Sequence, residues 1–142
     1  MTVKAILGAK GSQVISVKPD DKLSAAVKLL AERRIGAVLV MTDRHMDGIL
    51  SERDIVRVLG ERGAGVLDEP VSAVMTRKVV TCKSSDTVSM LMERMTAGKF
   101  RHLPVVENDV VIGLISIGDV VKSRVQEYER EQEALRDYIK TA

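Results

Sequence analysis

The sequence predicts an α+β protein in which two pseudo-symmetric β-α-β-β-α repeats pack sheet to sheet, with a C-terminal helical extension. The main observation is an internal repeat, because a shift of 65 residues aligns 14–56 with 79–121 without a gap. The second observation is composition: aromatic residues make up 2% of the chain, so the core must be aliphatic. Identical pairs in the alignment include Gly48/Gly113, Ser51/Ser116 and Asp54/Asp119.

Each repeat begins with a short β-branched segment, Val14–Val17 or Val79–Cys82. Polar turns follow, and their sequences, Pro19-Asp20-Asp21 and Ser84-Ser85-Asp86, are helix-start signals. An amphipathic helix comes next in each repeat. The residues predicted on its buried face are Leu23, Ala26, Val27 and Leu30 in the first repeat, and Val88, Leu91, Met92 and Met95 in the second.

Two strands and a second helix complete each repeat. The strands are predicted at 37–41 and 48–50 in the first repeat and at 103–106 and 110–115 in the second. A turn at 42–47 joins the first pair, whereas "NDVVIG" predicts a tight hairpin in the second. The final helices start at Glu52 and Ile117. The predicted domain limits are 8–60 for the first repeat, 61–74 for a glycine-containing linker, 75–125 for the second repeat and 126–142 for the helical extension.

The last helix is longer than one repeat needs. Val121, Val125, Tyr128, Leu135 and Ile139 form an apolar stripe among Glu and Arg residues. The pattern predicts an interaction helix that makes a homodimer contact, and the alternative is a solvated tail.

Composition restricts the classes of function. A net charge of +2 is too small to indicate a nucleic-acid partner, and no apolar run has the length of a membrane span. The single cysteine, Cys82, excludes an internal disulfide and favours a reducing compartment, so we expect a cytoplasmic protein. Cys82 aligns with Val17, which predicts a buried, inert thiol.

No pattern in the sequence indicates an enzyme. There is no nucleophile–base pair with an orienting group, no Walker or Rossmann glycine pattern, and no cluster of metal ligands. We therefore expect no catalytic residues, no metal and no required cofactor.

The motif Ser-x-x-Asp, at the start of both final helices, has two interpretations. A serine N-cap with an acidic residue three positions later is a capping box. Such a carboxylate can also accept hydrogen bonds from a ribose diol, while the serine hydroxyl and first-turn amides can meet a phosphate. Both copies carry Asp where capping boxes prefer Glu or Gln, and both have a glycine three residues before the serine, where another segment could approach closely.

These features together resemble a tandem pair of CBS domains, the Bateman module. The resemblance covers about residues 8–125 and depends on the ordered set "VMTRKVVTC", "RHLPVVENDVVIGLIS", "GILSERD" and "GLISIGD". The chain is most similar to small stand-alone CBS pairs that end in a charged helix. The resemblance implies two clefts, each made from parts of both repeats, that bind adenosine nucleotides.

Carried over by position, the resemblance predicts two unequal clefts. In the favoured cleft, Asp119 would hold the ribose and Ser116 would lie near the phosphate. The other predicted nucleotide-binding residues there are Lys10, Gly11, Gln13, Val14, Ile15, Gly36, Ala37, Arg101 and His102. The second cleft would use Ser51, Arg53, Asp54, Thr76 and Val80. Arg101 and Arg53 are the predicted phosphate cations, because a guanidinium offers a fork of donors.

The predicted function is regulatory. AMP, ADP, ATP, NAD(H) or S-adenosylmethionine would bind, with AMP or another adenosine nucleotide expected, and would change the activity of an unidentified partner protein. The alternative is a ligand-free interaction scaffold that acts through the dimer and the last helix.

Overall fold

The computed structural model describes residues 1–141, and packing divides the chain into two compact units. The first-repeat unit contains Gln13–Val80 and Asn108–Ile112. The second-repeat unit contains Met1–Ser12, Thr81–Glu107 and the chain from Gly113 onward. The N-terminal residues therefore fold with the second repeat, although they precede the first one in the sequence.

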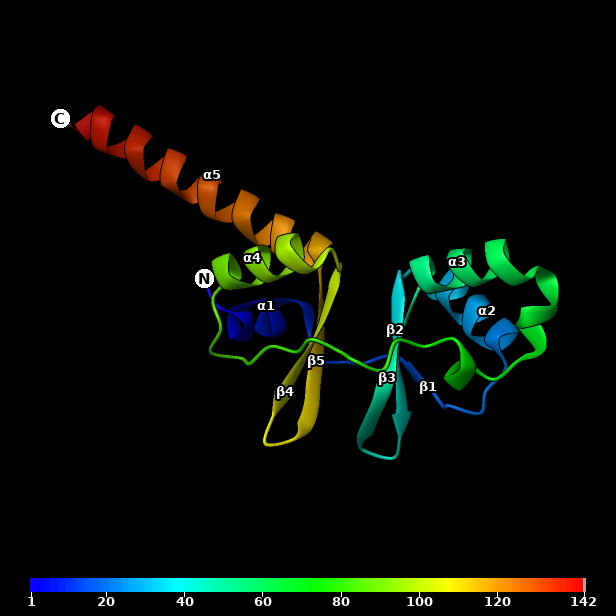
Figure 1. Ribbon diagram of the computed structural model, residues 1–142. Coiled ribbons are helices and arrows are strands. Elements are labelled where there is room, and N and C mark those ends of the chain that lie inside the picture. The colour runs from blue at the N-terminus through cyan, green and yellow to red at the C-terminus, as the bar shows by residue number, and fades with distance from the viewer. Residues whose placement is uncertain (142) are drawn as a thin grey trace. The chain divides into compact units, whose positions relative to one another are not determined.

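The first-repeat unit contains a three-stranded sheet in the order β1-β2-β3 (Figure 1). β1 (Ser16–Val17) is parallel to β2 (Ala37–Thr42), which is antiparallel to β3 (His45–Ser51). Helix α2 (Leu23–Arg33) connects β1 to β2, and β3 runs directly into helix α3 (Glu52–Arg62). The predicted β-α-β-β-α order is confirmed, with a shorter first strand and a longer third strand than the sequence predicted.

The core of this unit is aliphatic, as the composition requires. Leu23, Ala26 and Leu30 of α2 are buried, and Val27 is partly buried against them, as their spacing predicts. The segment after α3 adds to the same core through Val66 and Val71, at 2% and 0% exposure. It contains two short 3-10 helices, η1 (Ala64–Asp68) and η2 (Val71–Ala73).

The second-repeat unit contains three helices and a β-hairpin. Its elements are α1 (Val3–Lys10), α4 (Val88–Gly98), β4 (His102–Glu107), β5 (Val110–Ser116) and α5 (Ile117–Thr141). The strand predicted at 79–82 is wrong. The Cys82 amide donates to the Pro104 carbonyl and the Cys82 carbonyl accepts from the Val106 amide, both at 2.9 Å, which makes an isolated bridge too short to be a strand.

Helix α1 is an element that the sequence analysis does not predict. Thr2 caps it by accepting a hydrogen bond from the Ala5 amide at 3.4 Å. Val3, Ile6 and Leu7 are buried on one face, with the i, i+3, i+4 spacing of a packed helix. The helix thus supplies part of the core of the second-repeat unit.

Polar turns precede the first helices of the two repeats, which begin at Leu23 and Val88. Asp21 and Asp86 accept hydrogen bonds from the Lys18 and Lys83 amides, both at 2.9 Å, so each closes a turn before its helix. In the second repeat the cap is Thr87, whose hydroxyl accepts from the Met90 amide. The predicted polar turns are therefore present, and their aspartates close the turns without capping the helices.

The buried face of α4 is narrower than predicted. Val88, Leu91 and Met95 are buried, but Met92 is 38% exposed. Its predicted place on the buried face is wrong.

Both hairpins close with two-residue loops. In the second, Asn108 and Asp109 have φ of 50° and 63°, the left-handed conformation that a type I′ turn requires, so the predicted tight hairpin is confirmed. In the first, β2 ends at Thr42 and β3 begins at His45, so the loop is shorter than the turn predicted at 42–47.

The C-terminal extension continues the last helix of the second repeat, which begins directly after β5. Helix α5 runs for 25 residues, and its buried residues are Val120 and Ser123. Beyond that contact it projects away from α4 (Figure 1). None of the helices within residues 1–141 combines the length and apolarity needed to cross a bilayer.

Candidate functional site: two capped helix starts

The start of α3 has the geometry of a capping box. The Asp54 amide donates to the Ser51 hydroxyl at 3.3 Å, and the Ser51 amide donates to the Asp54 carboxylate at 3.0 Å. The Ser51 hydroxyl also lies 3.1 Å from the same carboxylate oxygen. The structural interpretation of Ser-x-x-Asp is therefore confirmed at this helix, since aspartate, although shorter than glutamate, completes the box.

Asp54 has partners beyond its own helix turn. The Thr76 hydroxyl donates to its Oδ1 at 3.2 Å, and Arg57 lies 3.4 Å from the same oxygen. Asp54 is only 5% exposed, so these contacts offset the cost of burying a carboxylate. Thr76 was predicted for this cleft, and the structure brings it to Asp54.

Gly48 allows Thr76 to reach this position. Reciprocal backbone hydrogen bonds join Ile49 and Thr76, with N–O distances of 3.0 and 2.9 Å. A Cβ atom on Gly48 would lie 2.6 Å from the Thr76 carbonyl oxygen and 3.0 Å from the Met75 sulfur. The close approach anticipated from the glycine's position is therefore present, and the approaching segment carries Thr76.

The start of α5 repeats the same arrangement with a different partner. The Asp119 amide donates to the Ser116 hydroxyl at 3.2 Å, and the Ser116 amide donates to the Asp119 carboxylate at 2.9 Å. Lys10, the last residue of α1, donates to Asp119 Oδ2 at 2.7 Å and to the Leu114 carbonyl at 2.9 Å. The ion pair is partly exposed, with 36% and 21% of the Lys10 and Asp119 side chains accessible.

The ionised form of Asp119 is favoured. Partial burial acts to raise the pKa of the carboxyl, but the hydrogen bond from Lys10 and the one from the Ser116 amide act in the opposite direction. Their combined effect is larger, and the pKa of Asp119 is lowered. Asp119 is thus a carboxylate acceptor whose present partner is a flexible ammonium group.

In each unit, the residue just before the hairpin is hydrogen-bonded to the first residue of the helix that follows the hairpin. The Glu52 amide donates to the Gly36 carbonyl at 2.9 Å, and the Ile117 amide donates to the Arg101 carbonyl at 2.7 Å. Gly36 therefore lies beside the start of α3, and Arg101 beside the start of α5. Arg101 is exposed there, as a predicted phosphate cation should be.

The remaining predicted residues fall in both units. Gly11 ends α1 with φ of 92°, and the Ile15 carbonyl accepts a hydrogen bond from Leu39 of β2 at 3.2 Å. Gln13, Val14, Ile15 and Ala37 belong to the first-repeat unit, whereas Lys10, Gly11, His102, Ser116 and Asp119 belong to the second. Arg53 lies in the first turn of α3, and Val80 is 47% exposed at the end of the first-repeat unit.

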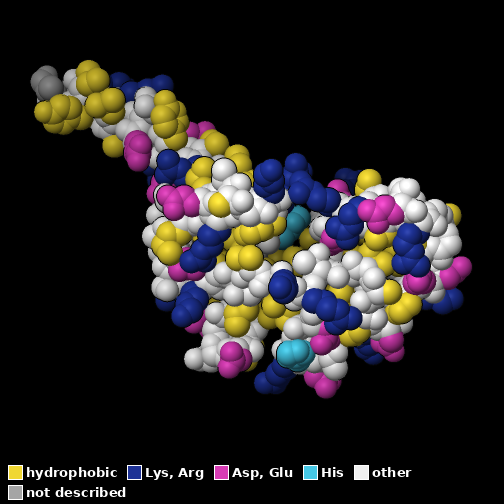
Figure 2. Space-filling model, in the orientation of Figure 1, with side chains coloured by type: hydrophobic (Ala, Val, Ile, Leu, Met, Phe, Trp, Pro, Cys, Tyr) yellow, Lys and Arg dark blue, Asp and Glu magenta, His cyan; other side chains and the backbone are white. Residues whose placement is uncertain are grey.

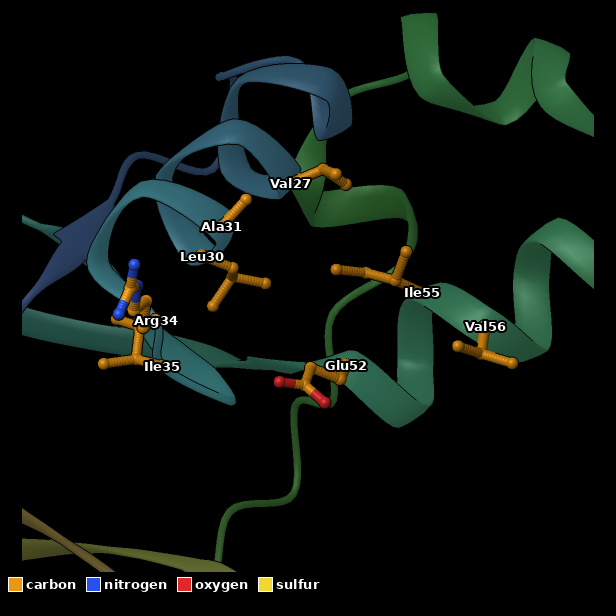
Figure 3. Close-up of a pocket in the computed structure, with 8 residues that line it drawn as sticks. All are labelled: Val27, Leu30, Ala31, Arg34, Ile35, Glu52, Ile55 and Val56. Carbon is orange, nitrogen blue, oxygen red and sulfur yellow. The ribbon is translucent and has the colours of Figure 1, made fainter.

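A groove that the sequence analysis does not anticipate lies between α2 and α3 (Figure 3). Its volume is about 520 Å³. In Figure 3, Leu30 of α2 and Ile55 of α3 face each other across it, with Arg34 and Glu52 at one end. The other lining residues are Val27, Ala31, Ile35 and Val56. Ser51 and Asp54 are not among the lining residues, although Glu52, the first residue of α3, is one of them.

The family model of the CBS domain matches the chain twice, at residues 6–61 and 71–125. The chain therefore belongs to the CBS-domain family and contains a pair of these domains.

Known proteins with the same pair support this assignment. The chain is 31% identical over 147 residues to the mitochondrial CBS domain-containing protein CBSX3 of Arabidopsis thaliana, covering 97% of this chain and 71% of that protein. A crystal structure of a CBS-domain protein from Agrobacterium tumefaciens has a TM-score of 0.86 at 46% identity, covering 87% of this chain and 99% of that one. Four further Arabidopsis thaliana relatives are much longer, since the match spans only 22–23% of their length.

One more distant structure contains a ligand. A CBS-domain protein from Pyrobaculum aerophilum was solved in complex with AMP. It has a TM-score of 0.74 at 24% identity, with 84% of this chain and 89% of that chain covered, so the likeness concerns the fold.

Proposed function

We propose that this CBS pair is a regulatory module that binds an adenosine nucleotide at its capped helix starts and modulates a partner protein without catalysing a reaction. The observation that carries the proposal is Asp119, an ionised, partly exposed carboxylate beside a serine hydroxyl and a helix N-terminus. The AMP complex of the Pyrobaculum aerophilum protein supports this ligand class.

The chemistry of the helix start suits the sugar–phosphate half of a nucleotide. A carboxylate accepts hydrogen bonds from both hydroxyls of a ribose, and charged acceptors make the stronger bonds. In the proposed complex the diol replaces Lys10 on Asp119 Oδ2. The released ammonium and the guanidinium of Arg101 then neutralise a phosphate near Ser116, where the helix dipole also favours negative charge.

The start of α3 is proposed as a second, weaker site. Its carboxylate is more buried than that of Asp119, and its partners are the Thr76 hydroxyl and Arg57. A diol that replaced Thr76 would release no cation for a phosphate, although Arg53 lies in the same first turn. The other residues of the two predicted clefts, including Gln13, Ala37 and Val80, remain predictions from the family resemblance.

The wider context of the proposal is a cytoplasmic homodimer that acts on an unidentified protein. A ligand can regulate such an assembly only if it binds one state more tightly than another. The alternative function is a ligand-free scaffold, and the apolar groove between α2 and α3 favours it as a second candidate because apolar walls suit protein contacts.

Calorimetry with AMP tests the proposal. Asp119→Asn keeps the size of the side chain but removes the charge, so AMP affinity should fall about tenfold to a hundredfold. Asp109→Asn is the matched control, since it makes the same change in a hairpin turn that asparagine also favours. Asp54→Asn should have the smaller effect.

Two results would contradict the proposal. One is wild-type protein that binds none of AMP, ADP, ATP, NAD or S-adenosylmethionine. The other is an Asp119→Asn variant that melts at a lower temperature and still binds AMP like the wild type, because the carboxylate would then serve only as a cap.

A further inference from the structure

Helix α5 has an apolar face that stays exposed among residues 1–141, the part of the chain that the structure describes. Val120 and Ser123 are the buried residues of the helix, and the Ser123 hydroxyl contacts the Met1 sulfur. Val121, Val125, Tyr128, Leu135 and Ile139 are 50–64% exposed. Figure 2 shows hydrophobic side chains along the projecting helix, between acidic and basic ones.

The exposed residues follow a heptad pattern. From Val121 the spacing alternates between four and three residues through 125, 128, 132, 135 and 139. These are the d and a positions of a coiled coil, and the seam continues for three heptads, to the end of the helix. A seam this narrow, with charges on both sides, fits one facing helix.

We propose that the α5 helices of two copies of this chain form a parallel, in-register, two-stranded coiled coil. The proposal specifies the surface and the direction of the homodimer in the proposed function. It does not depend on nucleotide binding, so the failure of one leaves the other untouched.

The flanking charges select the direction of the second helix. In a parallel pair, each g position faces the e position five residues later in the partner helix. Arg124 then faces Glu129, and Glu131 faces Arg136. Both contacts join opposite charges, and the two-fold symmetry makes each of them twice. Arg124 bonds Glu127 of its own helix at 2.9 Å. Its side chain is half exposed, so the guanidinium can also contact Glu129 of the second copy.

The antiparallel arrangement places like charges together. When the seams are aligned with a positions against d positions, e faces e and g faces g. Glu129 then lies near Glu129 of the second copy, Glu131 near Glu131, and Lys122 near Arg136. Like charges in such contacts are destabilising by about as much as opposite charges stabilise. The same sequence therefore favours the parallel pair and opposes the antiparallel one.

Gln132 fixes the register of the parallel pair. It occupies the central a position, between Val125 and Ile139. A polar residue at one a position costs stability but specifies alignment and two strands, because the two amides can hydrogen-bond only when they lie opposite each other. A slip by one heptad would bury each Gln132 against an apolar side chain.

Charge reversal with a matched control tests the surface. Glu131→Lys places two like-charge pairs in the parallel dimer, so sedimentation equilibrium should give a dimer dissociation constant about tenfold higher. Glu133→Lys makes the same change at a b position outside the seam and should leave the constant unchanged. The double variant Glu131→Lys/Arg136→Glu restores opposite charges and should recover the wild-type constant.

Disulfide trapping tests the direction. Leu135→Cys alone should cross-link in oxidised glutathione, because identical d positions face each other in a parallel pair. A mixture of Val125→Cys and Leu135→Cys chains would yield the mixed disulfide only if the helices were antiparallel. The wild type is the blank, since Cys82 is 2% exposed.

Several outcomes would overturn the proposal. They are a monomeric wild type, equal effects of Glu131→Lys and Glu133→Lys, a double variant as weak as the single one, or a mixed 125–135 disulfide in place of the 135–135 disulfide. AMP calorimetry on the same variants reports separately on the proposed function.

Discussion

Replacing Gly48 with alanine should destabilise the protein, although the same substitution elsewhere should stabilise it. The new Cβ would lie 2.6 Å from the Thr76 carbonyl oxygen and 3.0 Å from the Met75 sulfur. The oxygen cannot move freely, because it accepts a hydrogen bond from the Ile49 amide, and the Thr76 amide donates back to Ile49. Relief of the clash requires a backbone shift that weakens both hydrogen bonds.

The expected cost is that of overpacking, about 1–3 kcal/mol. For a chain of this size that lowers the melting temperature by about 4–12 °C. Gly113→Ala should cost less, because its Cβ would meet Leu7 Cδ2, the end of a flexible side chain, at 2.5 Å. Gly60→Ala is the control: it lies inside α3 with nothing within 4 Å, and should gain about 1 kcal/mol from helix propensity.

Thermal unfolding followed by circular dichroism ranks the three variants. We expect Gly60→Ala to melt at a higher temperature than the wild type and Gly113→Ala at a lower one. Gly48→Ala should have the lowest melting temperature of the three variants. A Gly48→Ala variant that melts with or above the wild type would refute the close approach of Thr76 to β3.

Two further predictions concern titration and reactivity. Because the folded pKa of Asp119 is lowered, the Lys10–Asp119 contact contributes stability above the usual pKa of the carboxyl and loses it as the pH falls through the lowered value. Lys10→Met should therefore cost about 0.5 kcal/mol in urea unfolding at pH 6 and progressively less as the pH falls through the lowered pKa of Asp119, and a cost that does not change with pH would contradict the ion pair. Burial, and to a lesser degree Asp86, raises the pKa of Cys82 to about 11, so the native thiol should resist Ellman's reagent at pH 8 and react on unfolding. Rapid reaction of the folded protein would show that Cys82 is accessible.

The fold was predictable wherever sequence pattern and local structure depend on the same residues. The repeat, the capped starts of α3 and α5 and the Asn108–Asp109 turn are of this kind, because each is decided within a few positions. Helix α1 is different, since its buried face has a partner far away in sequence: Leu7 lies against Gly113. The strand predicted at 79–82 failed for the related reason that β-branched residues describe a propensity, whereas a strand needs a neighbour along its length.

The site was predictable at the level of motif but not of contacts. Ser-x-x-Asp identified the carboxylates, and capping leaves Asp119 able to accept a second partner, since its Oδ2 accepts both the Ser116 amide and Lys10. The Lys10 contact spans 109 residues and depends on the unpredicted helix α1. The groove between α2 and α3 was also missed, because its lining residues read individually as ordinary helix positions.

The two helix starts differ in the side chain that reaches the carboxylate from a distant segment of the chain. At Asp54 it is a neutral hydroxyl on a segment held by backbone hydrogen bonds to β3. At Asp119 it is an ammonium on a flexible side chain at the end of a helix. An incoming nucleotide adds negative charge, and binding is favourable where that charge finds a cation. In the proposed complex Lys10 would exchange Asp119 for a phosphate and keep its hydrogen bond to the Leu114 carbonyl. Thr76 has no charge to offer, so two copies of one motif can differ in anion affinity through residues outside the motif.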